Sequence, residues 1–148
     1  IQHGFYDRLT LEMCIESVEA VIAKREVQHV LLTGIALDMA AEAGTLPEPL
    51  LTILRQDDLL YGVDEVLALG ITNVYGSIGL TNFGYLDKQK LGIIGRLNNR
   101  VEPGRVHTFL DDLVSGIAAA AAARLAHNAE VRPAESDTAF GPDGPQGA

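Results

Sequence analysis

Tryptophan is missing from this 148-residue chain, cysteine occurs once, and basic residues are few. With Cys14 as the single cysteine, no disulfide can form within the chain, which favours a reducing compartment. Eleven Lys and Arg residues against twenty Asp and Glu residues give a net charge of −9. This balance argues against nucleic-acid binding and against simple electrostatic docking on an anionic membrane. It suits a protein that binds cations.

The sequence also lacks a long apolar run and any strand-like alternation. Its most apolar stretch, residues 113–123, is well short of the ~20 residues that a membrane span needs. No segment alternates apolar and polar positions with β-branched residues, so no sheet is expected. No signal peptide is visible. We therefore expect an all-α protein in the cytoplasm, with at most peripheral contact at the inner membrane face.

Apolar residues at helical spacing predict a compact bundle of about six helices. Helices are expected near residues 11–22, 26–43, 48–56, 63–80 and 107–124, with a broken helix and loops over 81–106. Thr10 is the expected N-cap of the first helix, whose apolar face includes Cys14 as a core residue, and Gly44 is the expected end of the second. The capping box at residues 45–48, with its proline just inside the helix, predicts the start of the third.

One domain, residues 1–128, should contain these helices, and the alanine-rich helix near its end should be central. A close crossing with that central helix is predicted by a face of small and polar residues, which consists of Glu65, Thr72, Gly76 and Gly79. Beyond residue 128 the composition shifts to Pro, Gly, Ser, Asp and Ala, so a disordered tail is expected over 129–148.

Asp111 and Asp112 stand side by side in that otherwise apolar or small-residue helix. Burying two adjacent carboxylates costs on the order of several kcal/mol each unless a cation neutralises them. The other candidate acids are Asp64, Glu65 and Asp87. Carboxylates without a histidine or cysteine cluster favour a hard cation, Mg²⁺ first and Mn²⁺ or Ca²⁺ next, and these five could hold two ions.

Other acids have simpler interpretations. Asp38 lies on the apolar face of its helix, where we interpret it as an edge residue. Asp57 and Asp58 follow the third helix and predict a turn or a cap. Asp64 and Glu65 could also serve only the dipole of the helix that they begin.

Five of the eleven basic residues lie between residues 88 and 105, where Glu102 is the only acid. A basic loop beside an acidic cluster is expected where a phosphoryl group bridges metal ions and cationic side chains. We predict Lys90, Arg96 and Arg105 as phosphate contacts. His107 precedes Asp111 by four residues and is a candidate for proton transfer, so the predicted catalytic residues are Asp111, His107 and Lys90. A solvated loop and a structural histidine are the alternatives.

Three segments resemble the phosphatidylglycerophosphatase A family, in its soluble all-helical branch. They are Val-Asp-Glu-Val at 63–66, Phe-Gly-Tyr-Leu-Asp-Lys-Gln-Lys at 83–90, and Leu-Asp-Asp-Leu-Val-Ser-Gly at 110–116. The resemblance covers about residues 11–127. It implies Mg²⁺-dependent removal of the terminal phosphate from phosphatidylglycerophosphate in phospholipid biosynthesis, by a helical bundle that forms dimers or tetramers. Leu91 replaces a proline of the membrane-bound members, whose apolar spans are also absent here.

The leading hypothesis is a metal-dependent phosphomonoester hydrolase that acts on a phosphorylated lipid head group or a small phosphoester. One alternative is a helical Mg²⁺-dependent nucleotide pyrophosphohydrolase. Such enzymes favour acids three residues apart on several helices, a spacing found here only at Glu16 and Glu19. The other alternative is a non-catalytic oligomeric metal-binding scaffold, which would use the same ligands.

Overall fold

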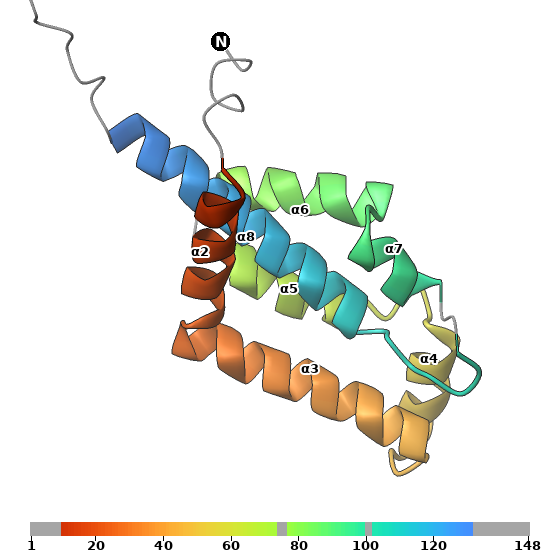
Figure 1. Cartoon of the computed structure of the whole chain (residues 1–148). Helices are drawn as coiled ribbons and strands as arrows, with labels where there is room; N and C mark the ends of the chain where they lie inside the picture. Colours follow the sequence, from red (N-terminus) through yellow and green to blue (C-terminus); the bar gives the residue numbers. More distant parts are fainter. Residues whose placement is uncertain (1–9, 74–76, 100–101, 132–148) are drawn as a thin grey trace, which may run out of the picture.

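The computed structural model describes residues 10–73, 77–99 and 102–131 (Figure 1). Within these ranges the chain forms seven α-helices and no strand. They are α2 (Leu11–Ile22), α3 (Arg25–Ala43), α4 (Leu50–Gln56), α5 (Val63–Asn73), α6 (Ser77–Gln89), α7 (Ile93–Asn98) and α8 (Leu110–Val131). The predicted all-α class is confirmed. α8 continues three residues into the predicted tail, and the rest of that tail, 132–148, lies outside the described residues.

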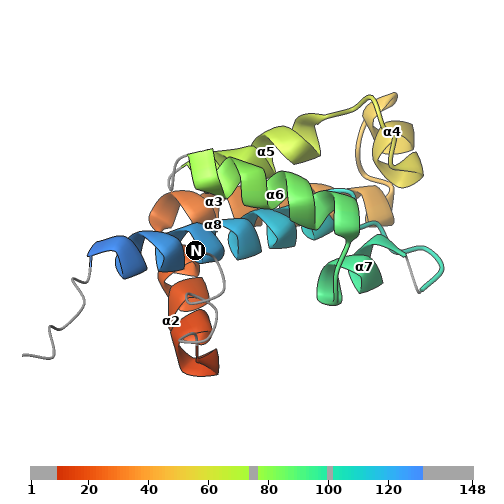
Figure 2. The same ribbon diagram turned by 90° about the horizontal axis from the view of Figure 1, so that it is seen from above.

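α8 is the central helix of the bundle. It packs against α2, α3, α5, α6 and α7, and Figures 1 and 2 show these helices on different sides of it. Its middle presents buried alanines at 119, 120, 121 and 123. Small side chains let neighbouring helices approach on several sides, so the predicted central position of the alanine-rich helix is confirmed. Among the described residues, no helix is long and apolar enough to cross a bilayer.

Glycine sets the distance between α8 and α5. A Cβ atom at Gly116 would lie 2.9 Å from the backbone oxygen of Ala68, which is closer than real Cβ contacts allow. Thr72, one turn further along α5, is fully buried. The close crossing of α5 with α8 is therefore confirmed. Gly79, predicted on the same face, lies instead on α6, where an added Cβ atom would lie 2.8 Å from the Thr72 oxygen, and Gly76 lies outside the described residues.

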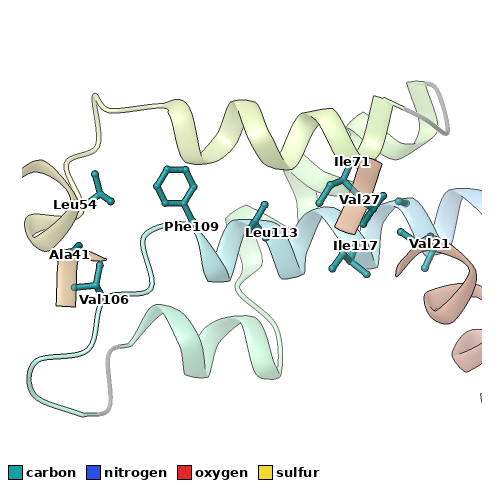
Figure 3. Close-up of a cluster of buried hydrophobic side chains, with 11 residues drawn as sticks. Val21, Val27, Ala41, Leu54, Ile71, Val106, Phe109, Leu113 and Ile117 are labelled. Carbon is teal, nitrogen blue, oxygen red and sulfur yellow. The ribbon is translucent and has the colours of Figure 1, made fainter. Parts of the chain in front are cut away.

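The hydrophobic core follows one face of α8. Figure 3 shows Phe109, Leu113 and Ile117 succeeding one another along this face, with Leu54 beyond one end and Val21 beyond the other. The ring of Tyr61 meets Phe109 edge to face, with ring centroids 5.8 Å apart. This packing fixes the start of α8, where the acidic pair lies.

Two predicted helix boundaries are wrong. The helix predicted over 63–80 is two helices, α5 and α6, and α6 extends into the segment 81–106, which the sequence predicts as a broken helix and loops and which also contains α7. α5 and α6 pack against each other as well as against α8, which a single continuous helix could not do. The capping box at 45–48 does not form either, since α4 begins at Leu50 and the Glu48 carboxylate accepts a hydrogen bond from Thr52 N at 3.2 Å.

The first helix begins as predicted but buries only part of its predicted apolar face. Thr10 caps α2 by accepting a hydrogen bond from Met13 N at 3.2 Å. The buried residues are Ser17 and Val21, and Ser17 Oγ donates to the Ala121 oxygen at 2.8 Å. Cys14 is half-buried, so its predicted core position is wrong. The reason is that α2 contacts α8 through the small Ser17. This contact leaves the apolar face of α2 partly exposed to solvent.

Substituting Gly116 with alanine should separate α5 from α8. We expect Gly116→Ala to lower the free energy of unfolding by about 1–3 kcal/mol, because the Ala68 backbone cannot move aside without disturbing the core. The matched control is Gly84→Ala in α6, where nothing lies within 4 Å of the added methyl group and a gain of roughly 0.5–1 kcal/mol is expected. Urea unfolding measures both. Equal effects of the two substitutions would contradict the close helix crossing.

Candidate functional site

An acidic cavity of about 210 Å³ lies among the first turns of α5 and α8, the end of α6, α7 and the connection between α4 and α5. Seven of its lining residues are acids: Asp57, Asp58, Asp64, Glu65, Asp87, Asp111 and Asp112. Lys90, Asn98 and Leu59 complete the lining. Seven carboxylates thus face one ammonium group, an excess of six negative charges if all of them ionise.

The acidic pair on α8 is buried in the first turn of the helix. Asp111 and Asp112 are each 5% exposed. The helix dipole favours negative charge at this end, which offsets part of the cost of burial. The pair thus occupies the position in α8 where buried carboxylates are least costly.

Asp38 of α3 caps α8 from outside that helix. Its carboxylate accepts hydrogen bonds from Phe109 N, at 3.1 and 3.2 Å, and from Leu110 N at 3.0 Å. Asp38 is 4% exposed, so its interpretation as an edge residue is wrong. It satisfies two backbone donors of a helix start that would otherwise be buried without partners. Asp38 thereby fixes the position of the turn that carries Asp111.

The α4–α5 connection contributes acids that the sequence analysis did not assign to a site. Asp57 is the C-cap of α4 with φ 56°, and Asp58 Oδ1 accepts a hydrogen bond from Leu60 N at 2.9 Å. The predicted turn is confirmed, yet both residues also line the cavity. Thr108 Oγ1 donates to the Leu54 oxygen at 2.6 Å, which ties the end of α4 to the start of α8.

Lys90 is the cation on which the carboxylates converge. Its Nζ lies 2.5 Å from Asp87 Oδ1, 3.1 Å from Asp111 Oδ2 and 3.7 Å from Asp112 Oδ1. Lys90 has φ 46°, a left-handed conformation that ends α6. A Cβ atom at Gly95 would lie 2.4 Å from the Lys90 oxygen, so α7 can fold back this closely only with glycine there. The α6–α7 turn therefore directs Lys90 toward α8.

Burial and mutual repulsion shift the pKa values of the cavity acids upward. Burial, with the charges of Asp111 and Asp87, raises the pKa of Asp112 to about 8. Burial also raises the pKa of Asp111 more than the Lys90 ammonium lowers it. Burial likewise raises the pKa of Asp64, against the hydrogen bond from Glu65 N. One lysine therefore does not fully offset the cost of burying these carboxylates.

The pKa of Lys90 is also raised, because the same carboxylates surround its ammonium group. Burial lowers the pKa of its ammonium group, but the hydrogen bond to Asp87 and the charge of Asp111 outweigh burial and raise the pKa above its ordinary value. Lys90 therefore stays charged. The cavity is thus a site where a cation is strongly stabilised.

The donor chemistry of the cavity fits a hard divalent cation. Among the described residues, no three His, Cys, Asp or Glu side chains are already arranged around a common metal position. Asp87, Asp111 and Asp112 instead surround the Lys90 ammonium, which stands in for a cation at their meeting point. Carboxylate oxygens, with the Asn98 amide nearby, are ligands suited to Mg²⁺, Mn²⁺ or Ca²⁺.

The structure brings together the predicted metal ligands and Lys90, but not the other predicted residues. His107 is half-buried, and its Nδ1 lies 2.9 Å from the Leu97 oxygen. Arg96 is exposed. Arg105 pairs with Glu102 at 3.1 Å and with Glu42 at 3.4 Å. None of these three lines the cavity.

The residues that sequence reasoning missed are Asp57, Asp58 and Asn98. A signal was available for the two acids. The chain contains three pairs of adjacent acids, at 57–58, 64–65 and 111–112, and all three line this cavity. Nothing in the sequence pattern distinguishes Asn98 from its neighbour Asn99.

The fold and the cavity define a class: a helical bundle whose central helix carries an acidic pair into a carboxylate-lined cavity. The chain belongs to the phosphatidylglycerophosphatase A family, whose sequence model matches residues 7–127. The matched region contains every residue that lines the cavity. The resemblance found in the sequence is therefore confirmed.

Relatives in two Bacillus species and in Listeria share both sequence and fold. The uncharacterized protein YpjQ of Bacillus subtilis is 55% identical over 127 residues, which are 86% of this chain and 71% of YpjQ. A solved structure of a protein of unknown function from Bacillus stearothermophilus has a TM-score of 0.82 and 60% identity, over 86% of this chain and 79% of that one. The low temperature requirement C protein from Listeria monocytogenes has a TM-score of 0.82 and 56% identity, over 87% and 80% of the two chains.

Removing the Asp38 cap should loosen the start of α8. Asp38→Ala leaves two buried backbone donors without partners, and we expect a loss of about 1–3 kcal/mol in unfolding free energy. Asp38→Asn keeps one acceptor oxygen and should cost less. Urea unfolding measures both, with the exposed Glu12→Ala on α2 as a control that should change little. Equal losses for the two Asp38 variants would contradict the capping role.

Asp38 should also make stability depend on pH. Burial raises the pKa of its carboxyl from 3.8 to about 6, so the folded protein binds an extra proton between these values. The stability from this proton is complete below pH ~4 and lost as the pH rises through ~6. The difference in unfolding free energy between wild type and Asp38→Asn should therefore fall by roughly 1–3 kcal/mol from pH 4 to 7. Urea unfolding in the presence of a chelator measures this difference. A difference that rises from pH 4 to 7 would contradict the prediction.

Proposed function

We propose that this protein is a metal-dependent phosphomonoester hydrolase that removes the terminal phosphate of phosphatidylglycerophosphate. Membership of the family supports the reaction class. The observation that carries the proposal is the cavity, in which acids from α5, α6 and α8 line one space together with Lys90. These elements are far apart in sequence, so only a folded site brings their carboxylates together.

The charge of the cavity explains why a metal should be required. A phosphoryl group is an anion, and it would enter a space that already has up to six excess negative charges. Coulomb repulsion opposes its binding until divalent cations neutralise the carboxylates. Asp87, Asp111 and Asp112 would hold one such cation, with Asp64 and Glu65 available to a second. A bound Mg²⁺ would supply neutralisation of the phosphoryl charge and activation of a water molecule.

Lys90 and Asn98 are the side chains in the lining that can donate hydrogen bonds to phosphoryl oxygens. The Lys90 ammonium has three N–H donors and is held at the cavity by its acidic neighbours. Arg96, Arg105 and His107 lie outside the lining, so they would not contact a phosphoryl group bound in the cavity. Positioning of the reacting group therefore depends on Lys90 and Asn98.

The test is phosphate release from phosphatidylglycerophosphate in detergent micelles, with Mg²⁺ or with a chelator. Asp111→Asn removes a buried carboxylate charge with little change in shape and should lower the rate by about 100-fold or more. Glu12→Gln, an exposed acid on α2, is the matched control and should keep wild-type activity. Activity that is unchanged by the chelator, or unchanged in Asp111→Asn, would contradict the proposal.

A second measurement separates catalysis from metal binding alone. A ligand that binds only the folded state stabilises that state. Mg²⁺ should therefore raise the melting temperatures of the wild type and of Glu12→Gln. It should raise the melting temperature of Asp111→Asn much less. Mg²⁺-dependent melting without phosphate release from any phosphomonoester would favour the non-catalytic metal-binding scaffold instead.

A further inference from the structure

Two adjacent leucines at the edge of the cavity are almost fully exposed. Leu59 is 97% exposed and Leu60 is 94% exposed, although Leu59 also lines the cavity. They lie in the α4–α5 connection directly after the acidic pair at 57–58. A single exposed leucine is ordinary, but two adjacent exposed leucines beside a charged cavity form an apolar patch that adjoins the site.

Exposed apolar residues also adjoin cavity-lining residues elsewhere. Leu91 directly follows Lys90, and Val63 directly precedes Asp64. We define the apolar rim as these exposed residues: Leu59, Leu60, Val63, Leu91 and Ile93. Figures 1 and 2 both place the α4–α5 connection and the α6–α7 junction at the same end of the molecule, near the start of α8.

Positive charge accompanies part of the rim. Residues 88–99 contain three basic residues and no acid, in a chain of net charge −9. Lys88 and Arg96 are exposed on either side of Leu91 and Ile93. Exposed apolar side chains flanked by bases are suited to the surface of an anionic bilayer, where they contact acyl chains and head groups respectively.

We propose that the apolar rim, with Lys88 and Arg96, docks on an anionic lipid bilayer, so that a phosphorylated head group enters the cavity while its acyl chains stay in the membrane. The inference rests on the proposed function and adds how the protein reaches a lipid substrate in a membrane. The cavity of about 210 Å³ is smaller than the roughly 300–1,000 Å³ of pockets that enclose drug-sized ligands, so it suits a head group without acyl chains.

A second copy of the chain fits the rim less well. Symmetric pairing at the rim would bring two cavities together, each with up to six excess negative charges. Like charges at an interface oppose association. Other exposed apolar residues, such as Leu32 and Met39 on α3, lie away from the cavity lining and avoid this repulsion. The cavity charges disfavour a second copy, and the exposed leucines with Lys88 and Arg96 are what favour the bilayer as the occupant of the rim.

Binding of the full chain to extruded vesicles, measured by cosedimentation in a chelator, tests the inference. Vesicles of phosphatidylglycerol and phosphatidylcholine should bind the wild type more tightly than vesicles of phosphatidylcholine alone. Leu60→Ser and Leu91→Ser should each weaken binding by about ten-fold, and Lys88→Gln by about five-fold on anionic vesicles only. Leu32→Ser, an exposed leucine on α3, is the matched control and should bind as the wild type does.

The outcomes separate this inference from the proposed function. Vesicle binding that depends on Leu60 and Leu91 supports the inference even if no phosphate release is found, since the binding assay needs no turnover. Hydrolysis without vesicle binding, or binding that Leu32→Ser weakens as much as Leu60→Ser does, overturns the inference alone. A smaller oligomer for Leu60→Ser in light scattering, with unchanged vesicle binding, would overturn it in favour of a second copy.

Discussion

Buried negative charge at the start of α8 is the constraint on which the rest of the structure depends. Asp111 and Asp112 are buried there because the small residues of α8 allow its neighbours to close around it. The helix dipole and the Lys90 ammonium offset part of the cost. The offset is incomplete, as the raised pKa of Asp112 indicates. A bound cation, as proposed above, would offset the remaining cost.

The elements around the cavity are held by contacts that serve position rather than chemistry. Asp38 caps α8 from α3, and Thr108 ties the start of α8 to the end of α4. Gly95 lets α7 fold back onto the Lys90 backbone. Each contact joins segments distant in sequence or reverses the chain sharply, so the geometry of the acids is set by the whole bundle. Contacts from several helices therefore position the site, although most of its lining comes from helix ends and connections.

The surface around the cavity matches the two-part chemistry of a lipid phosphate. Acids and a lysine form the interior, where a phosphoryl group and its cations would be bound. Exposed leucines and bases lie immediately outside it. The family to which the chain belongs supports the proposed reaction class, and this division of polar interior from apolar rim would provide the proposed route from a bilayer to the site.

The sequence by itself determined the helical class, the central alanine-rich helix and six of the residues that line the cavity, because periodicity and adjacent acids are local patterns. It did not determine that Asp57 and Asp58 join the site, since a turn and a site use the same residues. Nor did it show that Asp38 caps a distant helix, or that Arg105 pairs with Glu42 rather than entering the cavity. Only the tertiary structure decided these points, because which charge meets which partner depends on how the helices cross.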